Sequence, residues 1–221
     1  MKEITIVCPI FNEEENIELF IKNFNEIFKD HPDYKFSILF ADNNSTDSSR
    51  EILKKICEKR KEIKYIRYAK NNGVMKSLFN AIKHVDTDAC AVFDCDLQDD
   101  PKLLNEFIKN WELEIKIIYG KRVKRKEIFL LGFFRNIFKK LSNYLRGYEI
   151  EIESGAWFLD KEVIRQIRHD EYEPFLPLLI NNLDFESKGI EYERIERKRG
   201  FSKFNFFNYL SYAAEGLVSG T

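Results

Sequence analysis

Residues 89–101 read ACAVFDCDLQDDP, and this stretch decides how the rest of the chain is interpreted. Ala89 to Phe93 is a short apolar run, typical of a strand buried in a parallel sheet. Two carboxylates at alternate positions, Asp94 and Asp96, follow it directly, and Pro101 suits the first turn of a helix. The order of strand, polar turn and helix predicts one unit of an α/β domain, with both carboxylates at the edge of its sheet.

The same order recurs on both sides of this stretch. Strand-like apolar runs are expected at 4–8, 36–41, 63–68, 115–119, 155–159 and 190–195. Helical periodicity is expected at 17–27, 48–59, 73–85, 101–111 and 161–167. Strand and helix alternate over the first 120 residues, which predicts a Rossmann-like α/β fold. Its sheet is mostly parallel, and helices cover both faces.

Polar clusters follow four of the predicted strands. They are NEE at 12–14, DNN at 42–44, KNNG at 70–73 and DCD at 94–96. Sheets of this kind bind their ligands at the carboxyl ends of the strands. Chance explains any one of these clusters but explains four on one edge poorly, so the sequence predicts a ligand site there.

The carboxylates of Asp94 and Asp96 are hard oxygen ligands, which suit Mg²⁺ or Mn²⁺ when diphosphate oxygens complete the coordination shell. The competing interpretation is an Asp-rich cap of the next helix. Asp42 can accept a hydrogen bond from a base or a ribose, or it can cap a turn. Asn44 stands in a turn in which a positive φ angle is expected, and Asn tolerates that angle.

Basic residues concentrate in the second half of the chain. Nine of them fall between Lys121 and Arg146, against one acid, Glu127. Apolar residues at helical spacing over 130–145 share this segment, and a second helix, rich in aromatic residues, is expected at 204–218. The helix expected at 130–145 can lie in a membrane interface or pack on the sheet. The run RKRGFSK at 197–203 is a phosphate clamp or a solvated charge run.

Composition excludes several classes of protein. The formal net charge of −1 gives no global attraction to nucleic acid. The cysteines show neither a CxxC pair nor zinc spacing, which favours reduced, buried thiols in a cytosolic setting. They are Cys8, Cys57, Cys90 and Cys95. No apolar run reaches the roughly 20 residues of a membrane span. No signal peptide is expected, because charged residues at 2 and 3 lead directly into a strand.

Several motifs together carry a family resemblance. VCPIFNEE at 7–14, DNNSTD at 42–47 and DCDLQDDP at 94–101 are similar to V-x-P-x-[YF]-N-E-E, D-D-G-S-T-D and D-x-D-L-Q-x-P-P. Asn71 and Gly73 fit R-N-x-G, and 120–125 and 197–203 fit later phosphate-binding elements. In this order the motifs resemble the inverting GT-A-fold glycosyltransferase family 2. The branch is that of dolichyl-phosphate mannose synthases and bacterial polyprenyl-phosphate glycosyltransferases.

The resemblance implies one GT-A domain over 1–221, with a nucleotide-sugar-binding half at 1–120. Residues 121–221 would form the acceptor and membrane-surface half, with amphipathic interfacial helices. Relatives often continue into transmembrane helices near this point. The implied location is the cytoplasmic face of the plasma membrane, in cell-envelope polysaccharide synthesis. The protein would be peripheral or anchored by helices that this chain lacks, and self-association into a homo-oligomer stays open.

The resemblance also implies residue roles. The nucleotide-sugar would contact Pro9, Phe11, Asn12, Glu13, Asp42, Asn44, Asn71, Lys76, Asp94, Cys95, Asp96 and Gln98. Phosphates or the acceptor would contact Arg122, Arg125, Arg135, Arg197, Ser202 and Lys203. Asp94 and Asp96 would bind Mg²⁺ or Mn²⁺ and, with Arg122, act in catalysis. The implied reaction moves a sugar from a UDP-sugar, in preference to a GDP-sugar, to a polyprenyl phosphate with inversion.

The sequence departs from the family at two places. Residues 43 and 44 are both Asn, where the family has Asp and Gly. Ala156 and Phe158 replace the Asp or Ser and the Arg of the family's Gly-[Asp/Ser]-Phe-Arg-Leu, so a general base is missing there. A phosphate monoester is already an anion at neutral pH and needs no base, whereas a sugar hydroxyl does. The alternatives are a glycan-hydroxyl acceptor, with Glu153 or Asp99 as base, and a non-catalytic nucleotide-sugar-binding or membrane-docking module.

Overall fold

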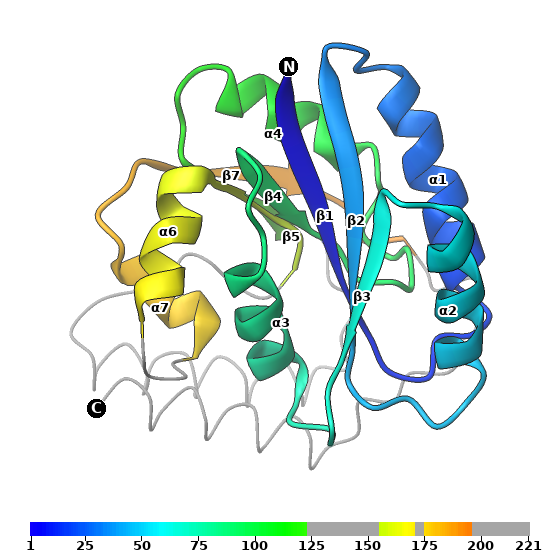
Figure 1. Ribbon diagram of the computed structural model, residues 1–221. Coiled ribbons are helices and arrows are strands. Elements are labelled where there is room, and N and C mark those ends of the chain that lie inside the picture. The colour runs from blue at the N-terminus through cyan, green and yellow to red at the C-terminus, as the bar shows by residue number, and fades with distance from the viewer. Residues whose placement is uncertain (123–154, 171–174, 196–221) are drawn as a thin grey trace, which may run out of the picture.

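A computed structural model describes residues 1–122, 155–170 and 175–195 of the chain (Figure 1). The predicted amphipathic helices at 130–145 and 204–218 lie outside these residues. Within the described part of the chain, no helix is long and apolar enough to cross a membrane.

The described strands form a seven-stranded sheet in the order β3-β2-β1-β4-β6-β5-β7. Their bounds are β1 (Lys2–Ile10), β2 (Tyr34–Asp42), β3 (Ile63–Arg67), β4 (Ala89–Val92), β5 (Ile117–Arg122), β6 (Trp157–Asp160) and β7 (Ser187–Tyr192). Neighbouring strands run parallel except at β6, which pairs antiparallel with both β4 and β5. The expected mostly parallel sheet is confirmed.

Helices connect the strands and cover both faces of the sheet, as expected. They are α1 (Ile17–Lys29), α2 (Ser49–Lys59), α3 (Val74–Lys83), α4 (Leu103–Trp111), α6 (Lys161–His169) and α7 (Leu176–Asn182). The sequence did not predict α7. It has seven residues and a proline in its first turn, so it is too short to show helical periodicity.

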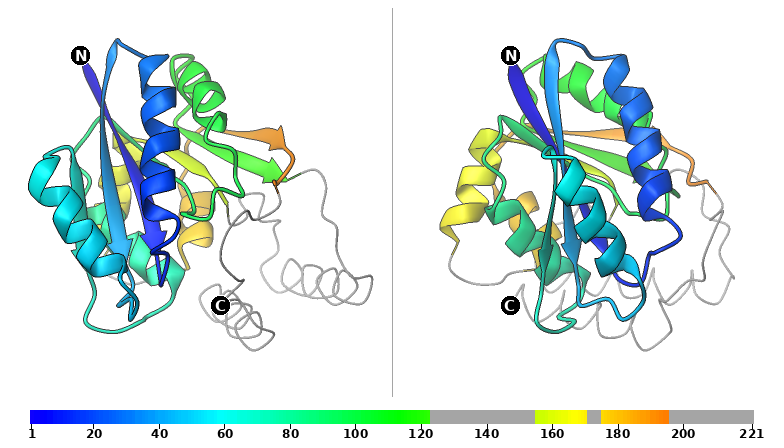
Figure 2. Two further views of the ribbon diagram at one scale, coloured as in Figure 1. Left: turned by 90° about the vertical axis from the view of Figure 1, so that its right-hand side faces the viewer. Right: turned by 45° about the vertical axis from the view of Figure 1, so that its right-hand side comes forward.

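Alternating side chains on the central strands build two cores. In β1, Ile4 and Ile6 face one core, and Val7 next to them faces the other. Residues of α1, α2 and α4 pack in the first core, and residues of α3, α6 and α7 pack in the second. Figures 1 and 2 show these two helix layers on opposite faces of the sheet. The strands therefore read as continuous apolar runs, because neither face meets water.

The polar clusters lie at one end of the sheet, as predicted. Ile10, the last residue of β1, pairs with Asp42, the last residue of β2. Val7 pairs with Val92, the last residue of β4, so the turn after β4 starts beside the end of β1. The N-terminus lies at the opposite end of the sheet (Figure 1). Parallel register thus brings turns from distant parts of the sequence to one edge.

Candidate functional site

A pocket lies at the carboxyl ends of the central strands. Its lining includes residues expected from the sequence, namely Pro9, Phe11, Glu13, Asp94, Cys95 and Asp96. It also includes residues that were not expected, namely Ile10, Asn43, Val74 and Ser77. The turn after β1, the turn after β2, the start of α3 and the turn after β4 therefore share one hollow.

The turn after β1 is held in place by the turn after β2. Asn12 adopts a φ angle of 56°, and its Oδ1 accepts a hydrogen bond from the backbone N of Thr46 at 2.7 Å. The backbone N of Asn12 donates to the Ser45 hydroxyl at 2.9 Å, and that of Glu13 donates to the Ser49 hydroxyl at 3.0 Å. Asn12 thus braces the loop that carries Phe11 and Glu13, and it does not line the pocket itself.

Asp42 and Asn44 lie behind the pocket wall and share one partner. The Asp42 side chain is fully buried, and its Oδ1 accepts from the backbone N of Ser45 at 2.8 Å. Arg67 of β3 places its Nη1 3.6 Å from Asp42 Oδ2 and donates from Nη2 to Asn44 Oδ1 at 2.9 Å. Asn44 has a φ of 65°, so the expected positive angle is confirmed. Within the described residues, Asp42 Oδ2 has the Arg67 ion pair but no hydrogen bond.

Amide side chains connect the turn after β2 to the start of α3. Asn43 donates from Nδ2 to Asn71 Oδ1 at 2.6 Å and accepts on Oδ1 from the backbone N of Asn72 at 3.1 Å. Asn71 Oδ1 also accepts from the backbone N of Gly73 at 3.0 Å. Gly73 has a φ of 88°, which favours glycine at this entry to the helix. Asn71 therefore orients Asn43, whereas Lys76, in the first turn of α3, does not line the pocket.

Asp94 and Asp96 lie beside one another at the pocket, on the turn after β4. Burial, together with the nearby Asp99 and Asp96 carboxylates, raises the pKa of Asp94 to about 7. The Asp94 side chain keeps 40% of its surface accessible, so solvent or a cation can screen part of this repulsion. Asp96 is more enclosed, at 14%, and its Oδ1 accepts from the backbone N of Gln98 at 3.1 Å. The turn passes through Leu97 at a φ of 55°, a strained angle for a leucine.

These two carboxylates fit a divalent cation held jointly with a ligand. Within the part of the chain that the structure describes, no group of three or more His, Cys, Asp or Glu side chains could hold a metal by itself. Mg²⁺ and Mn²⁺ accept hard oxygen donors, and Mg²⁺ is commonly bound through one or two carboxylates plus phosphate and water. With such a cation bound, Asp94 and Asp96 would supply that share of its coordination shell, and phosphate and water the rest.

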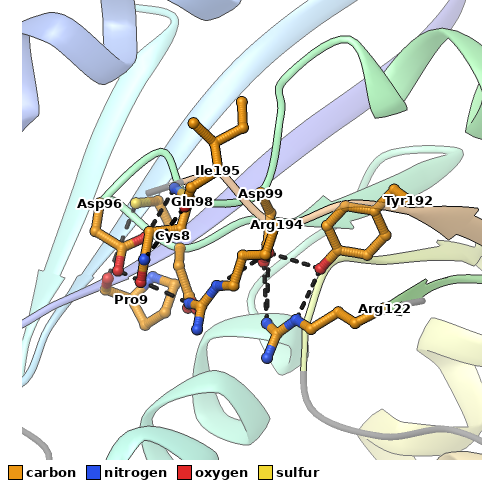
Figure 3. A network of polar contacts seen from close by, with 10 residues as sticks. Cys8, Pro9, Asp96, Gln98, Asp99, Arg122, Tyr192, Arg194 and Ile195 are labelled. Atoms are coloured by element: carbon orange, nitrogen blue, oxygen red, sulfur yellow. Dashed lines mark hydrogen bonds and ion pairs between the residues drawn. The ribbon is translucent and has the colours of Figure 1, made fainter. Parts of the chain in front are cut away.

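A buried carboxylate, Asp99, organises the charged side of the site (Figure 3). It is 1% exposed and accepts a hydrogen bond from the Tyr192 hydroxyl at 2.6 Å. Arg122 places Nη2 3.3 Å from Asp99 Oδ2 and donates from Nε to the Tyr192 hydroxyl at 2.9 Å. Burial alone would lower the pKa of Arg122, but the negative charges of Asp99 and Asp94 together with the Tyr192 hydroxyl outweigh this effect and raise that pKa. Arg122 is therefore a fixed cation.

Arg194 joins this cluster to the two pocket carboxylates. Its Nε lies 3.5 Å from Asp99 Oδ1, and its Nη2 lies 3.7 Å from Asp94 Oδ2 and 3.8 Å from Asp96 Oδ2. Figure 3 shows its guanidinium between Asp96 and Asp99. No role was expected for Arg194 or Tyr192 from the sequence. A signal was present, because the two residues lie two positions apart at the end of a predicted strand and so project to the same side.

Gly120 of β5 leaves space for the aromatic ring of Tyr192 from the neighbouring strand β7. A Cβ atom at position 120 would lie 2.7 Å from Tyr192 Cε1 and 3.2 Å from a Leu103 methyl group. The aromatic ring therefore occupies the space that a side chain would fill, and its hydroxyl reaches Asp99. The predicted phosphate-binding element at 120–125 begins inside β5, with Arg122 as its last strand residue.

The remaining residues discussed from the sequence lie next to the pocket, outside the described residues or in the core. Gln98 lies on the turn after Asp96, where it donates from Nε2 to the carbonyl oxygen of Ile195 at 3.3 Å. The phosphate-binding candidates Arg125, Arg135, Arg197, Ser202 and Lys203 lie outside the described residues, and so does Glu153. Ala156 and Phe158 are buried in the first core, so neither position offers a side chain to the pocket.

Comparison with known proteins identifies relatives of this chain. Residues 5–168 match the family described as Glycosyl transferase family 2. The chain is 29% identical to the bactoprenol glucosyl transferase of Shigella phage SfX, over 98% of this chain and 72% of that protein. It is 28% identical to the prophage bactoprenol glucosyl transferase homolog of Escherichia coli K12, with the same coverage. The chain spans about two thirds of the length of its curated relatives, from 66% to 72%.

Solved structures share the fold. A mannosyltransferase from Pyrobaculum calidifontis, in complex with GDP-Man and Mn²⁺, has a TM-score of 0.65 at 17% identity, over 98% of this chain and 62% of that one. Glucosyl-3-phosphoglycerate synthase from Mycobacterium tuberculosis, with Mn²⁺, UDP and phosphoglyceric acid, has a TM-score of 0.67 at 14% identity, over 99% and 77%. The expected GT-A fold is confirmed.

Proposed function

The chain belongs to glycosyl transferase family 2, and from this premise we propose that it transfers a sugar from a nucleotide-sugar to a polyprenyl phosphate. The observation that carries the proposal is the shared pocket. Asp94 and Asp96 line the same hollow as the loop after β1 and Asn43. Carboxylates for a metal–diphosphate and polar groups for a nucleoside therefore lie within reach of one bound donor.

The nucleoside would bind toward Pro9, Phe11 and Asn43, where ring contacts and amide hydrogen bonds are available. Asp42 and Asn44 support that wall from behind through Arg67. The proposed donor is a UDP-sugar, in preference to a GDP-sugar. Among solved proteins of this fold, one complex holds Mn²⁺ with UDP and another holds Mn²⁺ with GDP-Man, so both nucleotides belong in the test.

The diphosphate would lie beside Asp94 and Asp96, which would hold Mg²⁺ or Mn²⁺ together with it. When bound, this cation neutralises the negative charge that develops on the leaving nucleoside diphosphate. Arg122 stays positively charged beside Asp99, so it adds a fixed positive charge near the departing group. The proposed phosphate contacts of Arg125, Arg135, Arg197, Ser202 and Lys203 remain part of this proposal.

The proposed reaction is a single in-line displacement. An oxygen of the acceptor phosphate attacks the anomeric carbon, and the bond from that carbon to the diphosphate oxygen breaks. The electron pair of the broken bond leaves with the nucleoside diphosphate, and the anomeric configuration inverts. Positioning and charge stabilisation supply most of the catalysis. The attacking phosphate oxygen is already an anion and the diphosphate leaves as one, so neither group needs a proton transfer.

A phosphate acceptor is favoured over a sugar hydroxyl by the state of Asp99. This carboxylate is buried and already engaged by Tyr192, Arg122 and Arg194. A general base must reach its substrate, and a fully enclosed ion-paired carboxylate is badly placed to do so. The names of the curated relatives, bactoprenol glucosyl transferases, favour the same acceptor class.

The membrane surface and the cytoplasmic face of the plasma membrane belong to this proposal through the acceptor, since a polyprenyl chain resides in the bilayer. A role in cell-envelope polysaccharide synthesis follows from the same chemistry. Self-association into a homo-oligomer is compatible with it. A pull-down of purified protein on liposomes, with and without polyprenyl phosphate, would test the surface directly.

The decisive experiment is nucleoside diphosphate release from a panel of UDP- and GDP-sugars. The purified protein is given Mg²⁺ or Mn²⁺, with and without a short polyprenyl phosphate. We expect release with one donor that depends on the lipid and is abolished by EDTA. Nuclear magnetic resonance of the glycolipid product then reports the anomeric configuration.

Other outcomes point to the alternatives. Release that depends on a sugar acceptor and not on the lipid would indicate a glycan-hydroxyl transferase. Donor binding without release, by folded protein and with every acceptor, would indicate a nucleotide-sugar-binding module. Retention of the anomeric configuration would overturn the single-displacement step and leave the donor assignment intact.

A further inference from the structure

Arg194 contacts three carboxylates with one guanidinium. Nη2 lies within 4 Å of both Asp94 and Asp96, and Nε lies 3.5 Å from Asp99. All three contacts are longer than a direct hydrogen bond, so the group sits between the carboxylates and is not locked onto one of them. Its side chain is 32% exposed, so it can move without opening the core.

A further cation cannot bind to the carboxylates of this cluster unless Arg194 moves away from them. Asp94, Asp96 and Asp99 carry up to three negative charges, and Arg122 and Arg194 carry two positive ones. A divalent cation on Asp94 and Asp96 would stand beside the Arg194 guanidinium, which faces the same two carboxylates. Like charges at such separations repel strongly where water is partly excluded. The cation and Arg194 therefore compete for the pair.

Arg194 is nevertheless tethered at the site by contacts that a cation would not disturb. The backbone N of Ile195 donates to the carbonyl oxygen of Gln98 at 2.8 Å, and Gln98 Nε2 donates back to the carbonyl oxygen of Ile195. The Asp99 contact holds the Nε side of the guanidinium. Figure 3 shows Ile195 and Gln98 together near the Arg194 side chain.

We propose that Arg194 is the resident counter-ion of Asp94 and Asp96, which it holds together until it yields them to the divalent cation. The Asp99 and Gln98 contacts keep it next to the site after the exchange. Its Nη2 group is then available to a phosphate of the donor. This inference rests on the proposed function, because it takes Asp94 and Asp96 as the metal carboxylates.

Two consequences distinguish this role from simple packing. The cation alone binds weakly, because it must displace Arg194 from both carboxylates. A nucleoside diphosphate strengthens cation binding by more than its own ligation, because it gives the displaced guanidinium a negative partner. Removal of the Arg194 charge should therefore tighten binding of the bare cation and weaken the enhancement by the nucleotide.

The test measures Mn²⁺ affinity by electron paramagnetic resonance of the free ion, with and without UDP. The proteins are the unaltered chain, Arg194→Gln, Arg194→Lys and the control Arg60→Gln. Arg60 is similarly exposed, at 35%, and pairs with Glu62 on the surface. We expect Arg194→Gln to bind Mn²⁺ alone about three- to tenfold more tightly, and UDP to improve that affinity less than in the unaltered chain.

The Mn²⁺ affinity of Arg194→Lys should lie between those of the unaltered chain and Arg194→Gln. The affinity of Arg60→Gln should match that of the unaltered chain. Unchanged or weaker Mn²⁺ binding by folded Arg194→Gln would overturn the inference while leaving the metal site intact. Failure of the unaltered chain and of both Arg194 variants to bind Mn²⁺, even with UDP, would overturn the metal site itself and the inference with it. Circular dichroism checks folding. If Arg194→Gln does not fold, Arg194→Lys replaces it, because a single ammonium cannot face Asp99 and the Asp94–Asp96 pair with separate nitrogens as the guanidinium does. Arg194→Lys must then bind Mn²⁺ alone more tightly than the unaltered chain.

Discussion

The two sides of the pocket are built from different interactions. On the side of β1 and β2, amides, hydroxyls and backbone groups satisfy one another through hydrogen bonds, such as Asn43 to Asn71 at 2.6 Å and Thr46 to Asn12 at 2.7 Å. On the side of β4, β5 and β7, carboxylates and guanidiniums face one another, with Arg122 and Arg194 at 3.3 to 3.8 Å from the carboxylate oxygens.

Because the interactions differ, we expect the two sides to respond differently to a ligand. Short hydrogen bonds, with the Asp42–Arg67 ion pair behind them, fix the nucleoside side before any ligand arrives, which lowers the entropy cost of binding. The charged side consists of ionised side chains, and the attractions and repulsions among them change when a cation or a phosphate binds. The first side therefore acts as a rigid wall, and the second as an adjustable one.

The largest expected effect comes from Asp96→Asn on the charged side. An amide is a weaker cation ligand than a carboxylate, so we expect nucleoside diphosphate release to fall about 100- to 1,000-fold. Asp100→Asn is the matched control, because Asp100 accepts a hydrogen bond from the backbone N of Lys102 and does not line the pocket. Steady-state release measures both. Equal losses in the two variants would contradict a special role for Asp96.

Asp99→Asn would remove the buried negative charge that pairs with Arg122 and Arg194 on the charged side. Two guanidiniums would lose a buried carboxylate, so we expect the free energy of unfolding to fall by about 3 kcal/mol. The matched change on the side of β1 and β2 is Asp47→Asn, which alters the acceptor of the backbone N of Glu14 and Ser49 and should cost about 1 kcal/mol. Urea unfolding measures both costs. Similar values would show that the two walls do not differ in kind.

Gly120→Ala tests the packing that positions the charged side. The new methyl group would meet the Tyr192 ring, so we expect a loss of about 1–3 kcal/mol in the free energy of unfolding. In a Tyr192→Ala background the same change should cost much less, because the clash is gone. Thermal unfolding of the four proteins of this cycle measures the coupling. Additive losses would mean that Gly120 is needed for some other reason.

Asn43→Asp gives the smallest expected effect and tests the hydrogen bonds on the side of β1 and β2. A carboxylate cannot donate to Asn71 Oδ1, so one hydrogen bond is lost and we expect a cost of about 1 kcal/mol, with weaker donor binding. Asn72→Asp is the control, because Asn72 joins this cluster through its backbone N. Calorimetric titration with UDP compares the two variants. A gain in affinity from Asn43→Asp would show that the amide is not the preferred group at this position.

The sequence alone predicted the strands of the sheet and the edge at which the site lies. Apolar runs ended by polar turns are local signals, and they remained readable in 89–101, 36–41 and 4–8. The prediction that Asn44 takes a positive φ was confirmed for the same reason, since turn geometry depends on neighbouring residues. Boundaries were less accurate, and the strand expected at 190–195 is β7, Ser187–Tyr192.

The antiparallel insertion of β6 between β4 and β5 was not predicted. Strand order depends on which surfaces pack together, and an apolar run such as Trp157–Asp160 gives no sign of its neighbours. The short helix α7 was missed because seven residues carry too little periodicity. The residue types of these segments fit several arrangements, and packing selects one: β6 packs between both cores and α7 packs in the second.

The chemical groups at the edge of the sheet follow from the local sequence, because residues such as Asp94 and Asp96 come directly after their strand. Only the tertiary structure decided which charges oppose them. Arg194 lies almost a hundred positions along the chain from Asp96, and it reaches that carboxylate because β7 joins the sheet beside β5. Electrostatic attraction acts through space, so the partners of a charge are fixed by folding and cannot be read from its neighbours in sequence.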